Sequence, residues 1–205
     1  MTSARLRIPR VTDPDDPLFK PRLRGWSHAA MIPVVLVASV VLLVLAPTAT
    51  LRWACGVYAV TGLALFSVSA TYHLAQWNPT VSRVLKRLDH TNIMLVIAGT
   101  YTPLAACLLS RSSATLLLWL IWVGAAAGVA FRLLWTDAPR WLYTPVYVVL
   151  GLAALLYIGE FFDASAPAAV LICVGGAAYI VGAVCYALKA PTLHREWFGF
   201  HELFH

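Results

Sequence analysis

Charged residues are scarce in this chain. Asp, Glu, Lys and Arg make up 12% of its 205 residues, whereas hydrophobic residues make up 60%. A soluble domain carries about 25% charged residues, so about half of the usual solvating charge is absent. This shortage excludes an ordinary soluble globular domain and indicates a protein whose solvent is lipid.

A secretory signal peptide is also lacking. The first 27 residues are polar and contain several prolines, with neither an apolar core nor a small-residue cleavage site. We expect residues 1–27 to form a cytoplasmic polar tail and residues 28–205 to form a transmembrane helical domain. The four cysteines lie in apolar stretches without CxxC spacing, so we expect them to behave as small hydrophobic side chains.

Long apolar stretches are what the chain has instead. Each is about 20 residues long, which is the length that an α-helix needs to cross a bilayer. Short polar connections separate them. The sequence therefore predicts an all-α membrane protein with six complete spans, at approximately residues 28–47, 53–75, 88–109, 114–135, 141–161 and 166–188.

Basic residues are distributed unevenly between the two ends of these spans. With a cytoplasmic amino terminus, 13 of the 15 lysines and arginines fall on the cytoplasmic side, and only Arg52 and Arg111 fall on the other. Arg132 is among the 13, and we expect it to extend from the end of the fourth span to the interface. This asymmetry explains the net charge of +6 without a nucleic-acid partner. It predicts a multi-pass protein of the cell membrane with its amino terminus in the cytoplasm.

Polar residues gather where the second span ends and the third begins. Ser69 and His73 are four residues apart in FSVSATYHLAQWN, so they share one face of the second helix. Asp89 begins the third span in RVLKRLDHTNI, and an ionisable residue at that depth is costly unless it has a partner. We expect His73 and Asp89 to lie at similar depth on the two sides of a short hairpin.

Two more histidines lie at the end of the chain. After the polar segment KAPTLHRE the sequence becomes apolar again as WFGFHELFH, so a seventh helix starting there would carry His201 and His205 on one face. Its first two turns would lie at the same depth as His73 and Asp89. Three histidines and one carboxylate fit an open catalytic zinc site with water in the fourth position.

Three further histidines are not needed for such a site. His90 points about 100° away from Asp89 around the helix, so we expect it to face the loop. We expect His28 and His194 to be ordinary interfacial residues.

The final pentapeptide HELFH also matches H-E-x-x-H, the zinc-protease pattern in which Glu202 would be the general base. An intramembrane protease is the weaker interpretation, because Asp89 can already serve as base and no third ligand follows in the sequence. We expect Glu202 to face the cytoplasmic boundary or to pair with a basic residue such as Arg195.

Three separated motifs carry a family resemblance: SATYH, LDHTNI with AGTYTP, and GFHELFH. In this order they resemble the hemolysin III proteins, the bacterial branch of the progestin and adipoQ receptor family, from about residue 20 to the end of the chain. The resemblance implies a bundle of seven transmembrane helices, of which this chain holds six complete spans and the start of the seventh. A full seventh helix would continue for about 15 residues past His205, so we expect the sequence to be shortened at its carboxyl end.

The resemblance also implies a zinc ion near the cytoplasmic face. It places the metal on His73, His201 and His205, gives Asp89 the role of holding the water on the metal, and puts Ser69 beside it. The family is related to alkaline ceramidases, which hydrolyse lipid amides. We therefore expect a zinc-dependent hydrolase of lipid amides or esters, or a receptor-like relative, whose partner is a membrane lipid and not a nucleic acid.

Two other functions stay open. A pore-forming or cytolytic protein, as the family name suggests, should show a polar stripe through several spans, and the fourth and sixth spans show almost none. A membrane-homeostasis protein with structural zinc would use Asp89 as a direct fourth ligand. The sequence does not determine the oligomeric state.

Two further patterns concern helix packing. The runs GAAAG in the fourth span and GGAA in the sixth predict close approach of neighbouring helices. Pro103 in GTYTP predicts a kink or a loosened turn in the third span, with Thr100, Thr102 or a neighbouring helix supplying a partner for the freed carbonyl of Gly99. The functional interpretation of Pro103 is that the kink opens a cavity above the zinc.

Overall fold

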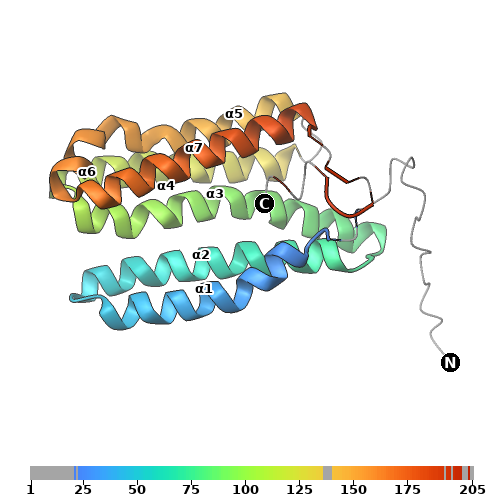
Figure 1. Cartoon of the computed structure of the whole chain (residues 1–205), viewed down its shortest axis with the longest axis horizontal. Helices are drawn as coiled ribbons and strands as arrows, with labels where there is room; N and C mark the ends of the chain where they lie inside the picture. The colour runs from blue at the N-terminus through green and yellow to red at the C-terminus, as the bar shows by residue number, and fades with distance from the viewer. Residues whose placement is uncertain are drawn as a thin grey trace.

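The computed structural model describes residues 21, 23–135, 140–191, 193–194, 196–199 and 203. Helices dominate this part of the chain, and within it the β-type pairing is a single isolated bridge between His194 and Phe198. The helices run side by side in one elongated bundle (Figure 1). They are α1 (Trp26–Leu45), α2 (Ala49–Leu74), α3 (Pro79–Leu108), α4 (Arg111–Leu134), α5 (Arg140–Gly151), the 3₁₀ helix η1 (Leu152–Tyr157), α6 (Ile158–Ala164) and α7 (Ala166–Leu188).

Six stretches of the described residues are long and apolar enough to cross a membrane. Five are single helices, and the fifth in chain order is the stretch Thr144–Ala164, which contains most of α5, then η1 and α6. Many large apolar side chains on α1 and α7 are exposed, as lipid-facing side chains are. The six predicted complete spans are confirmed.

Polar side chains start several of these helices. Thr48, Asn78, Ser110 and Ser165 each accept a hydrogen bond from the backbone N–H three residues later, at the starts of α2, α3, α4 and α7. Such caps satisfy N–H groups that have no partner within the helix. Because the helices start sharply after short connections, consecutive spans become antiparallel neighbours.

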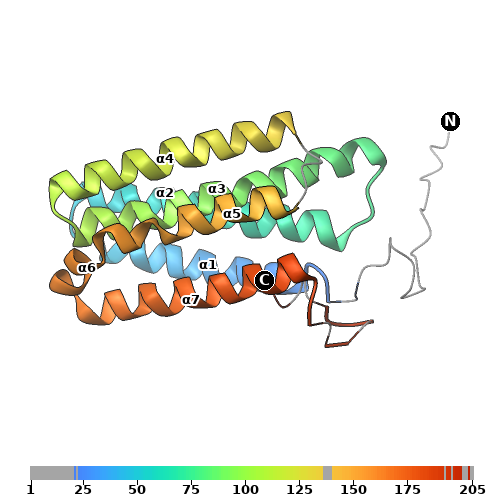
Figure 2. The same ribbon diagram turned by 90° about the horizontal axis from the view of Figure 1, so that it is seen from above.

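Helix α3 lies at the centre of the bundle. It packs against α2 on one side and α4 on the other, and it also contacts α5 and α6. Helix α1 packs on α2, and α7 packs on α5 and α6 (Figures 1 and 2). The fully buried core lies between α3, α4 and the fifth span, and includes Met94, Ala98, Leu117, Ile121 and Phe161.

The fifth span is interrupted, although the sequence predicted one continuous helix. Helix α5 ends at Gly151 and the next six residues form η1. The phenol of Tyr101 in α3 donates to the carbonyl of Gly151 at 2.7 Å and accepts from the N–H of Ala154 at 2.8 Å. Tyr101 thereby replaces bonds that a continuous α-helix would make within itself.

Close packing of small residues is confirmed for α4 and was wrong for α7. A Cβ atom built on Gly128 would lie 2.9 Å from the sulfur of Met94, and one on Gly124 would lie 2.7 Å from Leu150. By contrast, a Cβ on Gly175 or Gly176 would meet no atom of the described chain within 4 Å. The glycines of α4 therefore allow its neighbours to come close, whereas Gly175 and Gly176 of α7 have no close neighbour among the described residues.

Helix α3 continues through Pro103 to Leu108. The hydroxyls of Thr100 and Thr102 donate to the carbonyls of Val96 and Ala98, both at 2.8 Å. The carbonyl that Pro103 leaves without a helical donor is that of Gly99, and neither hydroxyl donates to it, so the predicted role of the two threonines is not confirmed. The effect of Pro103 on a cavity stays a prediction.

Candidate functional site at one end of the bundle

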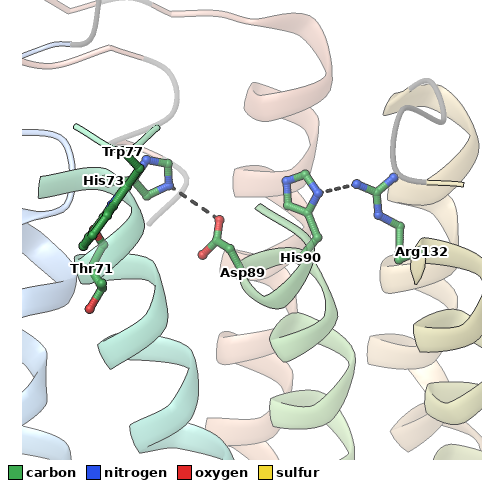
Figure 3. A network of polar contacts seen from close by, with 6 residues as sticks. All are labelled: Thr71, His73, Trp77, Asp89, His90 and Arg132. Carbon is green, nitrogen blue, oxygen red and sulfur yellow. Dashed lines mark hydrogen bonds and ion pairs between the residues drawn. The ribbon is translucent and has the colours of Figure 1, made fainter. Parts of the chain in front are cut away.

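His73, in the last turn of α2, faces Asp89, which lies about three turns into α3 (Figure 3). Their Nε2 and Oδ2 atoms are 3.6 Å apart, and their side chains are 7% and 11% exposed. This distance is longer than a hydrogen bond but leaves the imidazole and the carboxylate close enough to interact electrostatically. The hairpin thus brings the two residues to one depth, as predicted. We call this end of the bundle the site end.

Ser69 lies one helical turn before His73 and is 1% exposed. Its hydroxyl interacts with the carboxylate of Asp89, yet it makes no hydrogen bond of good geometry to a described group. A buried hydroxyl in this condition is costly. Ser69, His73 and Asp89 therefore form one polar group between α2 and α3.

Gly25 packs directly against His73. Its backbone is left-handed, with φ of 86°, which favours glycine. A Cβ atom at this position would lie 2.9 Å from the Cβ of His73 and 3.2 Å from the backbone nitrogen of Leu74. The segment that precedes α1 thus closes one side of the site, and only a residue without a side chain fits there.

Two side chains hold the ends of α2 and α3 around this group. The indole of Trp77 donates to the carbonyl of Thr71 at 2.9 Å, which satisfies a group at the carboxyl end of α2 (Figure 3). One turn past Asp89, the amide of Asn92 donates to the carbonyl of Ala64 at 3.2 Å. The relative position of the two helices is thereby fixed beside the site.

Arg132 and His90 form a second polar pair next to the first (Figure 3). Arg132 is 1% exposed, and its guanidinium contacts Nδ1 of His90. The expectation that Arg132 extends to the interface was wrong, and so was the expectation that His90 faces the loop. Because α3 has neighbours on several sides, a direction 100° from Asp89 still points into protein. No pattern in the sequence indicates this pairing.

A cavity of about 330 Å³ begins beside Asp89 and His90. Its walls come from α1, α2, α3, α5 and α7, and most of its lining surface is apolar. Along α3 it extends from Asp89 to Thr100, which corresponds to about 16 Å of helix. An elongated, mostly apolar space with a carboxylate and an imidazole at one end suits a molecule with a hydrocarbon chain and a polar group.

His28 belongs to the wall of this cavity. It is 4% exposed, and its ring meets the edge of Phe66 at a centroid distance of 5.2 Å. The expectation of an ordinary interfacial histidine was wrong for His28. His194, in contrast, is exposed.

His201 and His205 lie outside the described residues. Within the described part, no group of three or more His, Cys, Asp or Glu side chains is placed to hold a metal ion. The structure brings together His73, Asp89 and Ser69, and the ligand role of the two terminal histidines stays a prediction.

Comparisons with known proteins agree with the motifs. The profile of the haemolysin-III related family matches residues 17–205. A hemolysin-3 homolog of Bacillus subtilis (strain 168) is 30% identical over 146 residues, which cover 70% of this chain and 68% of the relative. Hemolysin-3 of Bacillus cereus is 30% identical over 143 residues, covering 69% of this chain and 65% of the relative.

A human relative extends the similarity beyond bacteria. Monocyte to macrophage differentiation factor is 25% identical over 178 residues, covering 84% of this chain and 74% of that protein. No solved structure matches the chain. The matched segment spans about two thirds of the two Bacillus relatives. The chain belongs to the hemolysin III family, the bacterial branch of the progestin and adipoQ receptor family.

Proposed function

We propose that the protein is a zinc-dependent membrane hydrolase that cleaves an ester or amide bond of a lipid. One observation carries the proposal: a buried imidazole and carboxylate, 3.6 Å apart, stand beside the polar end of an elongated apolar cavity. A lipid chain fits such a cavity, and the polar pair supplies groups that bind metal and move protons.

We further propose that the site end faces the cytoplasm and that a seventh helix starts near Gly199. Basic residues support the orientation, because Arg24, Arg83, Lys86 and Lys189 lie at the site end of the described spans, whereas Arg52 and Arg111 lie at the other. Support for the helix comes from a bond of α-helical spacing, from the N–H of Leu203 to the carbonyl of Gly199 at 3.1 Å.

The residues present fit zinc. Imidazole and carboxylate are both zinc ligands, and the Ser69 hydroxyl beside them is buried without a well-formed hydrogen bond to the described chain. His73 would hold the ion together with His201 and His205 of the proposed seventh helix. When bound, zinc would polarise a carbonyl group and make water more acidic.

The side chains of the site would then divide the remaining work. Asp89 accepts a proton from the attacking water, because it lines the cavity and is acceptor-only when ionised. Ser69 restrains the carboxylate of Asp89 from the side of α2. The apolar wall holds the hydrocarbon chain and excludes bulk water.

Metal analysis tests the zinc site. We expect about one equivalent of zinc per chain in purified protein, in accordance with a single site. His73→Ala should lose most of it, and His194→Ala, which changes an exposed histidine of the same end, should retain it. Less than half an equivalent in the wild type, unchanged in His73→Ala, would rule the zinc site out.

Turnover of a panel of lipid amides and esters tests the reaction. Asp89→Asn should keep the zinc and lower kcat by about 100-fold or more, because the general base is lost. If Asp89→Asn loses zinc as well, Asp89 is a direct ligand and the zinc is structural. If the wild type hydrolyses none of the lipids, the hydrolase proposal fails.

Cytolysis is the second candidate, and the observation that favours it is that the two Bacillus relatives are named as hemolysins. Leakage of a dye from liposomes on addition of purified protein would support it. Leakage that persists in His201→Ala would separate lysis from the proposed zinc site.

A further inference from the structure

Helix α3 presents two adjacent polar side chains to the cavity, and the proposed reaction uses one of them. Both Asp89 and His90 line the cavity, whereas Ser69 and His73 are not among the described residues that line it. A ligand in the cavity would therefore contact His90 and not Ser69. The question is what the imidazole of His90 can offer such a ligand.

The contact with Arg132 determines which nitrogen of His90 carries the proton. The guanidinium group of arginine has donors and no acceptor, so Nδ1 of His90, which Arg132 contacts, must accept. The ring is then neutral and carries its proton on Nε2. Arg132 is 1% exposed, so bulk water does not compete with the ring for the guanidinium.

The other ring nitrogen of His90 points away from Arg132, toward the side of Asp89 and His73 (Figure 3). The backbone of His90 is held as well, because the hydroxyl of Tyr147 donates weakly to its carbonyl at 3.5 Å. Side chain and backbone are thus both restrained, with an N–H group directed to the polar end of the cavity.

A lipid carbonyl at this place would be stabilised further by such a donor. Asp89 is acceptor-only when ionised, so it offers no hydrogen bond to a carbonyl oxygen. In a water-excluded cavity, one fixed donor aimed at that oxygen contributes far more than it would in water.

We propose that His90 donates a hydrogen bond from Nε2 to the carbonyl oxygen of the lipid ester or amide in the cavity. Arg132 is the positioning residue that fixes the ring in this donor form. The role in turnover rests on the proposed hydrolase function, and the hydrogen bond to a carbonyl ligand can be measured without turnover.

The first test reads the tautomer directly. The full chain, labelled with ¹⁵N at its histidines, is studied by NMR in lipid nanodiscs, and His90→Gln identifies the His90 signals. We expect the wild-type ring to be protonated at Nε2 alone, and Arg132→Met to abolish this preference. The matched control Arg83→Met removes an exposed arginine of α3, the helix that carries His90. It should leave the His90 signal unchanged. A wild-type ring protonated at Nδ1, or at both nitrogens, overturns the proposal.

The second test adds a carbonyl ligand. Oleamide is the probe, and 1-octadecene, with a chain of the same length and no carbonyl, is its control. We expect oleamide to shift the Nε2–H resonance of His90 and octadecene to leave it nearly unchanged. An equal shift with both ligands, or no shift with saturating oleamide, overturns the proposal.

The third test uses turnover and separates this inference from the proposed function. His90→Leu should retain zinc and KM but lower kcat by about 100-fold, as loss of an oxyanion donor does. His90→Gln, whose amide can place an N–H near the position of Nε2, should recover part of the rate. If the wild type is active and His90→Leu is equally active, the inference fails and the hydrolase stands. If the wild type is inactive on all lipids, the hydrolase fails and the two NMR tests decide the role of His90.

Discussion

At the scale of single residues, Gly25 has the strictest environment near the site. Its left-handed backbone and its contact with His73 each oppose a side chain. We predict that Gly25→Ala lowers the free energy of unfolding by about 1 to 2 kcal/mol from the backbone alone. The displaced His73 should also bind zinc less tightly.

Thermal unfolding in detergent and metal analysis measure the two effects of Gly25→Ala. The control is Gly56→Ala in α2, where a Cβ atom would meet no described atom within 4 Å. Equal melting temperatures and equal zinc contents for both variants would contradict the prediction.

Gly128 is a second position where a side chain has no room. A Cβ atom there would meet the end of Met94, which is fully buried in the core. We predict that Gly128→Leu lowers the free energy of unfolding by about 1 to 3 kcal/mol, as overpacking does. Gly175→Leu, which would extend into open space, is the control. An equal decrease in melting temperature for both variants would show that the loss of stability has another cause.

The same scale shows what the sequence can and cannot predict about the site. The depth of His73 and Asp89 in the membrane was predictable, because short polar connections determine where each span begins and ends. The neighbours toward which the side chains of His90 and Arg132 point were not predictable. A helix angle specifies which way a side chain points, but not which of several neighbouring helices stands there. His28 is a similar case: its sequence position indicates the membrane boundary, but neighbouring helices bury its side chain.

At the scale of elements, all six spans follow from apolar length, and four of them also begin at a polar cap, but the interruption of the fifth does not follow from the sequence. Its central residues LAALLY contain neither proline nor glycine, so local sequence favours a continuous helix. The interruption depends on Tyr101, which lies 50 residues away from Gly151 in sequence. A tertiary hydrogen bond of this kind leaves no periodic pattern to read.

The role of Tyr101 in the fifth span leads to a prediction. Tyr101→Phe removes the acceptor for the N–H of Ala154 and the donor to Gly151 in an apolar region. We predict a loss of about 1 to 3 kcal/mol in the free energy of unfolding, because buried backbone groups lose a partner. Tyr58→Phe is the control, since the Tyr58 hydroxyl makes no hydrogen bond to the described chain.

Hydrogen exchange locates the effect of Tyr101→Phe. The amide of Ala154 should exchange faster in this variant than in the wild type or in Tyr58→Phe. Unchanged exchange at Ala154 would mean that η1 re-forms a continuous α-helix when the phenol is lost.

At the scale of the whole molecule, the bundle has a basic end and an end with few charges. Among the described residues, the site end carries Arg24, Arg83, Lys86, Arg87 and Lys189, whereas the opposite end carries Arg52 and Arg111. Basic residues near the ends of spans are retained in the cytoplasm. The orientation of the protein therefore determines from which side of the membrane water, metal and lipid headgroups reach the site.

We predict that the site end lies in the cytoplasm, and single cysteines test this. In a chain whose four native cysteines are replaced by alanine, Thr80→Cys marks the site end and Ser112→Cys marks the opposite end. Both positions are exposed in the first turns of their helices. A membrane-impermeant maleimide added to intact cells should label Ser112→Cys and leave Thr80→Cys unlabelled, and permeabilised cells should show both labelled. Labelling of Thr80→Cys in intact cells would place His73 and Asp89 at the outer face, and the proposed hydrolase would then act on lipids of the outer leaflet.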